Sequence, residues 1–207
     1  MPEASAALIV TDVQNSFMPG GSLAVPAGDE IVPIINALAR RFANVILTQD
    51  WHPAGHRSFA SSHPGKKPFD TVALEFGDQI LWPDHCVQGS EGARLHPGLD
   101  IARAQLVLRK GYHTNVDSYS AFIEGDGTTR TGLASYLRER GIDSVYLCGL
   151  ATDFCVAWSA LDARKLGFAA TVIEDACRAI DTGGSLAAAW ERMARAGVGR
   201  IHSADLA

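Results

Sequence analysis

The feature that most constrains the fold is a repeated alternation of short apolar runs with longer amphipathic stretches. Each run is rich in β-branched residues and ends in turn residues, which is typical of a strand buried on both faces. The runs lie at 6–12, 44–50, 105–111, 144–150 and 169–175, with a weaker sixth at 199–203. Apolar residues at three-to-four spacing predict helices at 30–42, 131–140, 154–167 and 183–197. This alternation predicts an α/β fold, a three-layer α/β/α sandwich around a mostly parallel six-stranded sheet.

One region departs from the alternation. Between positions 51 and 104 the sequence shows no clear strand or helix, only proline, glycine, histidine and aromatic residues. Such a long irregular stretch inside a compact domain usually has a function. With 207 residues and no linker or repeat, we expect one domain over 1–207 with a loop insertion at about 51–104.

Composition excludes several classes of partner. The net charge is −5 and no basic stripe occurs, so neither nucleic acid nor a membrane surface is favoured as a partner. No apolar run is long enough to span a membrane, and the N-terminal residues do not resemble a signal peptide. The four cysteines lack short paired spacings, which favours a reducing compartment. We therefore expect a cytoplasmic protein.

Charged side chains stand at the ends of successive predicted strands. Asp12 closes the first, Asp50 the second and Lys110 the third, and the segment CGLATDFCV follows the fourth. A strand-terminal aspartate often only caps a turn. In an open α/β sheet, however, ligands bind outside the carboxyl ends of the strands, so four such ends together predict a functional site.

Within CGLATDFCV, Cys155 is predicted in the first turn of a helix. Free N–H groups and the helix dipole at such a position stabilise a thiolate, and a nearby lysine would lower the thiol pKa further. The same N–H groups could receive an oxyanion. Cys148, inside the strand, is interpreted as a small buried side chain, and a disulfide between the two is disfavoured in a reducing compartment. The alternative for Cys155 is a buried helix residue without a chemical role.

A second cluster is formed by DWHPAGH and WPDHC. Asp50 and His52 are two positions apart at a strand end, and His85 from the long loop could add a third ligand. Two imidazoles and one carboxylate suit Zn²⁺, Fe²⁺ or Mn²⁺. His56 could be a fourth ligand or could support one of the others. The alternative is that these histidines only bind loop backbone.

Five segments together resemble the nicotinamidase/pyrazinamidase branch of the isochorismatase-like cysteine hydrolases. They are VTDVQNSFMPGGSLAV, TQDWHPAGHRSFAS, WPDHCVQGSEGARLHP, RKGYHTNVDSYSAF and CGLATDFCV, in the order that the family places them. The resemblance implies a catalytic triad of Asp12, Lys110 and Cys155. The activity that it implies is conversion of nicotinamide to nicotinate and ammonia through a thioester, with pyrazinamide as a second substrate and NAD salvage as the context.

The resemblance also implies one divalent metal ion, with Zn²⁺ expected before Fe²⁺ or Mn²⁺, and a defined pocket. The metal ligands would be Asp50, His52 and His85, with His56 or water in a fourth position. A cis peptide at Leu150–Ala151 would turn the N–H groups of Ala151 and Cys155 into an oxyanion hole. The pocket for the small-molecule substrate would be lined by Phe17, Leu23, Trp82 and Tyr119. Members of the family range from monomers to larger assemblies, so a homo-oligomer is compatible with the sequence.

Two alternatives stay open at this point. A metal-independent amidase of the same superfamily, acting on N-carbamoyl or ureido substrates, would keep the triad but would not need the histidine motifs. An isochorismatase proper would normally lack the nucleophilic cysteine. From another class, an inactive member of the fold could serve as a scaffold, which a titration of the Cys155 thiol would test.

Overall fold

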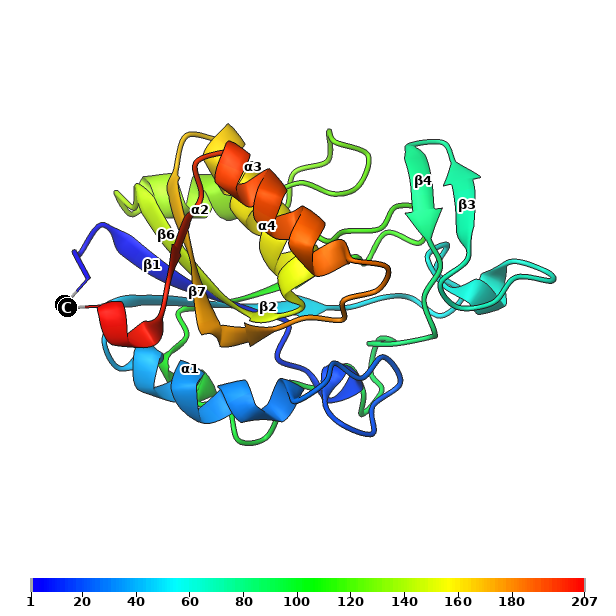
Figure 1. Ribbon diagram of the computed structural model, residues 1–207, viewed down its shortest axis with the longest axis horizontal. Coiled ribbons are helices and arrows are strands. Elements are labelled where there is room, and N and C mark those ends of the chain that lie inside the picture. Colours follow the sequence, from blue (N-terminus) through cyan, green and yellow to red (C-terminus); the bar gives the residue numbers. More distant parts are fainter. Residues whose placement is uncertain (1, 207) are drawn as a thin grey trace.

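The computed structural model describes residues 2–206 and places six strands in one sheet (Figure 1). The strands are β1 (Ala6–Thr11), β2 (Asn44–Asp50), β5 (Leu106–Lys110), β6 (Ser144–Leu150), β7 (Ala169–Arg178) and β8 (Gly199–Ile201). Their order is β5-β2-β1-β6-β7-β8, and every neighbouring pair runs parallel. The predicted parallel sheet is confirmed.

Helices cover both faces of this sheet, which confirms the three-layer sandwich. In Figure 1, α1 (Ile31–Ala39) lies on one face, and α2 (Leu133–Glu139), α3 (Ala157–Lys165) and α4 (Ser185–Arg195) lie on the other. The three-to-four spacing explains why α1 packs there, because Ile31, Ile35 and Leu38 fall on one side and are all buried. No helix among residues 2–206 is both long and apolar enough to cross a membrane.

The order of the strands reverses at the centre of the sheet, between β1 and β6. From β1 the chain proceeds outward through β2 to β5, and it then returns to β6 on the other side of β1. In sheets of this kind a crevice opens at the carboxyl ends of the two central strands, where ligands bind. Asp12 follows β1 and Cys155 follows β6, so the fold brings both residues to this crevice.

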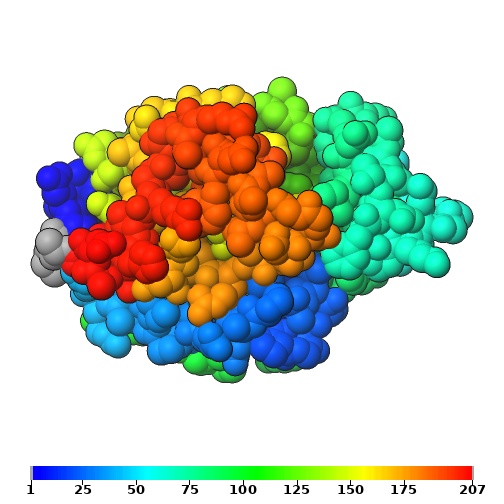
Figure 2. All heavy atoms as spheres, in the orientation of Figure 1, coloured from blue at the N-terminus to red at the C-terminus, as the bar shows by residue number. Residues whose placement is uncertain are grey.

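The insertion contains a hairpin that the sequence did not indicate. Strands β3 (Thr71–Leu74) and β4 (Gly77–Ile80) pair in antiparallel fashion outside the main sheet. The second strand was missed because GDQI has only one β-branched residue and no apolar alternation, and TVAL alone, at four residues, is too short to be identified as a strand. In Figures 1 and 2 the hairpin and its flanking turns, in cyan and teal, project at one end of the molecule. The expectation of an irregular 51–104 stretch is therefore wrong for these ten residues 71–80.

Short helical turns complete the chain. The 3₁₀ turns are η1 (Asn15–Phe17), η2 (Gly28–Glu30), η3 (Ala60–Ser62), η4 (Ile101–Arg103) and η6 (Ser203–Asp205). The turn η5 (Thr152–Val156) is a π-helical turn that leads directly into α3. The predicted helix at 154–167 thus begins with a wider turn, and Cys155 lies within it.

Candidate active site

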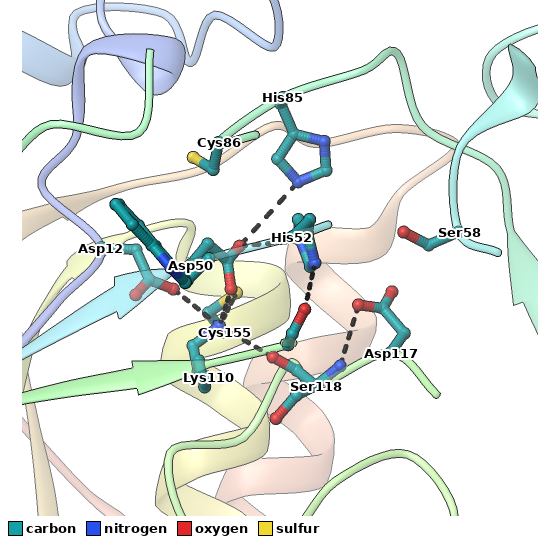
Figure 3. Close-up of polar contacts among 12 residues, drawn as sticks. Asp12, Asp50, His52, Ser58, His85, Cys86, Lys110, Asp117, Ser118 and Cys155 are labelled. Carbon is teal, nitrogen blue, oxygen red and sulfur yellow. Dashed lines mark hydrogen bonds and ion pairs between the residues drawn. The ribbon is translucent and has the colours of Figure 1, made fainter. Parts of the chain in front are cut away.

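Lys110 is the residue on which the charged strand ends converge (Figure 3). Its Nζ lies 2.9 Å from Asp12 Oδ2 and 2.5 Å from Asp50 Oδ1, and it also donates to the Ser118 carbonyl at 2.8 Å. The sulfur of Cys155 is 3.5 Å from the same nitrogen. Lys110 and Asp12 are completely buried. The structure therefore brings the three predicted catalytic side chains into contact.

The two carboxylate oxygens of Asp12 have different partners. Its Oδ1 accepts a hydrogen bond from the Thr48 hydroxyl at 2.6 Å, whereas Oδ2 is buried and faces the Lys110 ammonium at 2.9 Å, without a further hydrogen bond among residues 2–206. Burial raises the pKa of Asp12 above its ordinary value, and the charge of Lys110 opposes this effect without cancelling it. The carboxylate is therefore a stronger base than an exposed aspartate.

The Cys155 thiol differs in one respect from the sequence-based expectation. Burial raises the pKa of Cys155 well above its ordinary value, although Lys110 acts in the opposite direction. The carboxylates of Asp12 and Asp50 strengthen the rise, because one oxygen of each lies within 4.8 Å of the other and of the sulfur. The sequence suggested that the helix start and a nearby lysine would lower the thiol pKa, whereas in the folded chain burial outweighs the effect of Lys110. The proton must leave when the sulfur attacks.

Close approach of two strands positions this turn. Gly149 has φ +113°, and a Cβ atom at its position would lie 2.1 Å from the Thr11 carbonyl oxygen. Only glycine lets β6 pass so near β1 at the carboxyl edge. The following Leu150–Ala151 peptide bond is cis, as the resemblance implied. Among residues 2–206 no group accepts the Ala151 N–H, and Ala151 lines the same cavity as Cys155.

Asp50, His52 and His85 form a second cluster directly beside Lys110. One ligand atom of each lies within 4.8 Å of the other two, and all three residues are buried. The Nε2 atoms of His52 and His85 lie 3.7 Å and 3.8 Å from Asp50 Oδ2. Their Nδ1 atoms are 2.8 Å from the carbonyls of Gly111 and Pro83, so each ring turns Nε2 toward the carboxylate. Backbone bonds on the far nitrogen are how proteins orient metal-binding histidines.

The electrostatics of the cluster suit a divalent cation. Burial and the charge of His52 lower the pKa of His85 to about 4, so its ring is neutral near neutral pH. Burial would raise the pKa of Asp50, but Lys110 and His52 reverse this and hold it far below its ordinary value. Burial would lower the pKa of His52, yet the Asp50 carboxylate raises it. One carboxylate and two converging imidazoles match the preferences of Zn²⁺ and Fe²⁺.

His56 lies beside this cluster without facing it. Its Nδ1 is 2.7 Å from the Ser58 hydroxyl, and its Nε2 is 3.0 Å from the His113 carbonyl. The ring centroid is 4.4 Å from that of His52. Because both nitrogens are engaged, the geometry favours solvent over His56 in a fourth ligand position, with His56 supporting His52 by packing.

Gly111 is a residue of this site that the sequence did not single out. It has φ +66°, and a Cβ atom there would lie 2.5 Å from Cε1 of His52. Its carbonyl also binds His52 Nδ1. Glycine is needed both for the left-handed backbone and for the approach of the ring. Its place directly after Lys110 in RKG was the available signal.

The predicted pocket residues do line one cavity, of about 20 Å³, which has room for one water molecule. The cavity also touches Asp50, His85 and Cys155, so it joins the two clusters. Three further lining residues were not predicted, namely Asp117, Phe154 and Ile180. Asp117 and its neighbour Ser118 come from the loop after β5, which the structure turns back toward Lys110.

Comparisons with known proteins agree with this geometry. The sequence model of the isochorismatase domain matches residues 6–205. A nicotinamidase of Acinetobacter baylyi is 59% identical over 202 residues, covering 98% of this chain and 94% of its own length. The structure of an Acinetobacter baumanii nicotinamidase and pyrazinamidase superposes with a TM-score of 0.99 at 59% identity, covering 100% of both chains. A Pyrococcus horikoshii pyrazinamidase, solved in complex with zinc, gives a TM-score of 0.78 at 36% identity, covering 96% of this chain and 99% of its own.

The match extends over nearly the whole chain, so it includes both side-chain clusters as well as the sheet. The chain belongs to the isochorismatase family, and within it to the branch of the nicotinamidases and pyrazinamidases.

Proposed function

We propose that the protein hydrolyses the carboxamide of nicotinamide to give nicotinate and ammonia, and that it also accepts pyrazinamide. The observation that carries the proposal is the contact of Lys110 with Asp12, Asp50 and Cys155 in one buried cluster. This contact supports Cys155 as the nucleophile, Asp12 as the base and Lys110 as the cation, beside a set of possible metal ligands and a cavity with aromatic walls. The relatives from both Acinetobacter species support the choice of substrate.

The first half of the reaction uses the Cys155 thiol and Asp12 Oδ2. Cys155 Sγ attacks the carboxamide carbon while its proton passes to Asp12 Oδ2, the oxygen that faces Lys110 and has no further partner among residues 2–206. The carbonyl oxygen gains the negative charge and is received by the N–H groups of Ala151 and Cys155. Each donor of this kind stabilises the transition state by about 2.7–4 kcal/mol. Asp12 then gives the proton to the amide nitrogen, and ammonia leaves a thioester on Cys155.

The second half reverses these roles. Asp12, again a carboxylate, removes a proton from a water molecule that attacks the thioester carbon. The C–S bond breaks, the proton returns to the sulfur, and nicotinate leaves. The raised pKa of Asp12, caused by burial, favours both proton transfers. Lys110 keeps its positive charge throughout and offsets the charge of the two neighbouring carboxylates.

We further propose that Asp50, His52 and His85 hold one divalent ion, with Zn²⁺ as the first candidate. The converging Nε2 atoms and the carboxylate fit such an ion, and the Pyrococcus relative was solved with zinc. When bound, the ion would supply a Lewis acid for the ring nitrogen of the substrate. The residues of this chain orient the ring through the walls formed by Phe17 and Trp82.

The product suggests the biological context. Nicotinate is a precursor for NAD, so we propose a role in NAD salvage in the cytoplasm. The rival, a metal-independent amidase for N-carbamoyl or ureido substrates, would have no use for His52 and His85 turned toward Asp50 by two backbone carbonyls.

Ammonia release from nicotinamide by the purified protein tests the proposal, with a chelator-treated sample alongside. We expect turnover that chelation removes and that Zn²⁺, Mn²⁺ or Fe²⁺ restores. Turnover that persists after verified removal of the metal would contradict the proposed metal requirement but not the proposed hydrolysis of nicotinamide. No turnover with metal present would move the substrate to the carbamoyl or ureido amides, which are assayed in parallel.

A further inference from the structure

The hairpin β3–β4 projects from the body of the protein, yet one of its side chains reaches the wall of the substrate cavity. Gly77 and Asp78 of β4 are exposed, whereas Gln79 is only 3% exposed. Its side chain leaves the hairpin and meets Asp117 and Tyr119, two residues that line the cavity. A buried amide on an otherwise exposed strand needs partners, and these two residues provide them.

Gln79 belongs to a small hydrogen-bond network in which two N–H donors contact the hydroxyl oxygen of Tyr119. Its Nε2 lies 2.9 Å from Asp117 Oδ2, 3.1 Å from the Tyr119 hydroxyl and 2.7 Å from the Ile80 carbonyl. The indole nitrogen of Trp82 donates to the same hydroxyl at 2.9 Å. The other Asp117 oxygen accepts the Ser118 N–H at 2.8 Å. Both residues of the wall are thus fixed by protein donors.

These contacts decide which hydrogen-bonding group Tyr119 presents. The two hydrogens of Gln79 Nε2 serve three acceptors, so at least one of them is shared. Neither this nitrogen nor Trp82 Nε1 can accept a proton, so the phenol oxygen is the acceptor in both contacts and its own proton points to neither nitrogen. Burial raises the pKa of Tyr119 well above its ordinary value, so the hydroxyl keeps its proton. No hydrogen bond from that proton to an acceptor occurs among residues 2–206. The proton is therefore free to bond to a ligand or to water beside Tyr119, which lines the cavity.

We propose that Gln79 is a positioning and specificity residue, which holds Tyr119 as an obligatory hydrogen-bond donor to an acceptor on the heteroaromatic amide substrate. The inference rests on the proposed function and deepens it. The amide of Gln79 also keeps Asp117 turned toward the hairpin, so that the carboxylate does not compete for the Tyr119 proton. In this way the insertion, remote from the reacting atoms, selects what can bind in the cavity.

Two substitutions of nearly equal size test the role of the amide. Gln79→Met removes the donor, and Gln79→Glu replaces it by an acceptor that captures the Tyr119 proton. We expect KM for nicotinamide to rise about tenfold in the first variant, the effect of one hydrogen bond. We expect a larger rise in the second and a kcat within about twofold of wild type in both. Asp78→Asn, on the same hairpin but exposed and without a bond to the wall, should leave both constants unchanged.

A double-mutant cycle separates positioning from mere support of the fold. In a Tyr119→Phe background, Gln79→Met should raise KM by less than about threefold, because its main partner is already gone. Equal penalties in both backgrounds, or a loss confined to kcat, would overturn the inference. Thermal unfolding and metal content are measured on every variant, and a rise in KM that appears only in variants with lowered stability or lowered metal content would likewise count against it.

Substrate binding measured on a variant that cannot turn over nicotinamide distinguishes a failure of this inference from a failure of the proposed function. The dissociation constant of nicotinamide is measured by calorimetry on Cys155→Ala and on Cys155→Ala with Gln79→Met. About tenfold weaker binding by the double variant supports the role of Gln79, even if the wild-type protein releases no ammonia. Absence of ammonia release together with this result would contradict only the proposed function. Equal dissociation constants for the two proteins would contradict only the role of Gln79. Absence of nicotinamide binding by either protein would contradict both the role of Gln79 and the proposed function.

Discussion

The site is built from two regions that are fixed in different ways, the carboxyl edge of the sheet and the insertion. Asp50 and Lys110 are direct partners in the parallel register of β2 and β5, so their contact follows from the pairing of the strands. His85 and Gln79, in the insertion, are oriented instead by hydrogen bonds of their side chains, His85 to a backbone carbonyl and Gln79 chiefly to Asp117 and Tyr119. In the proposed mechanism the edge of the sheet therefore provides the reacting groups, and the insertion orients the metal ligands and the residues that select the substrate.

The largest expected effect lies at the sheet edge. Cys155→Ala should abolish nicotinamide turnover, because no other thiol lines the cavity among residues 2–206. Substrate binding, measured by calorimetry, should remain within about threefold of wild type, since the sulfur contributes little surface. A thioester trapped from this variant and detected by mass spectrometry would contradict the assignment of the nucleophile.

Lys110→Met tests how much the buried lysine at the edge of the sheet contributes to the free energy of unfolding. Removal of the cation leaves Asp12 and Asp50 buried without their common partner. Breaking a buried ion pair in this way costs about 3–5 kcal/mol of unfolding free energy. Urea unfolding measures the loss at neutral pH, with exposed Lys165→Met as the control. A loss below about 1 kcal/mol would show that the carboxylates do not depend on Lys110.

Substitutions of two histidines test which residues of the insertion are metal ligands. His52→Ala removes a predicted ligand and should weaken metal retention at least about 100-fold. His56→Ala removes the ring that packs on His52 and its bonds to Ser58 and His113, but none of the three proposed ligands. Its effect should therefore stay within about tenfold. Elemental analysis after dialysis against graded chelator measures both. Equal losses would return His56 to the ligand set, and an unchanged metal content would remove His52 from it.

The smallest effect is expected where the two regions meet. Phe17 follows β1, and its ring packs 5.5 Å from the ring of His85 in the insertion. Phe17→Ala should raise KM for nicotinamide about two- to tenfold through lost ring packing, with little change in kcat. Steady-state kinetics decide this, with Phe17→Leu as a milder control. A fall in kcat alone would mean that Phe17 orients His85 and does not contact the substrate.

The two regions also differ in how far the sequence predicts them. Continuous apolar runs identify the central strands because a strand buried on both faces needs them, and the strand ends then place Asp12, Asp50 and Lys110 at one edge. The carboxyl end of β7 was predicted three residues too short. Its polar residues suggested a turn, whereas a shift of register opposite Leu147 lets the pairing continue to Arg178.

What the sequence could not provide depends on packing in three dimensions. Gln79 occurs in a short segment without a strand pattern, and its role arises only because the hairpin folds against Asp117 and Tyr119. The high pKa of Cys155 likewise results from burial, which a helix-start pattern does not report. The histidine motifs were recognisable from the resemblance, but the separate place of His56 was not.

Asp50 divides its two oxygens between the regions, one toward Lys110 and the other toward the paired imidazoles. A divalent ion drawn to one oxygen withdraws electron density from the other and weakens its hold on the lysine. If the proposed ion binds there, its occupancy and the ionisation of the Cys155 thiol would be thermodynamically linked through a single side chain. Linkage of this kind is reciprocal, so alkylation of Cys155 would change the affinity for the ion by the same factor by which the ion changes the equilibrium for alkylation.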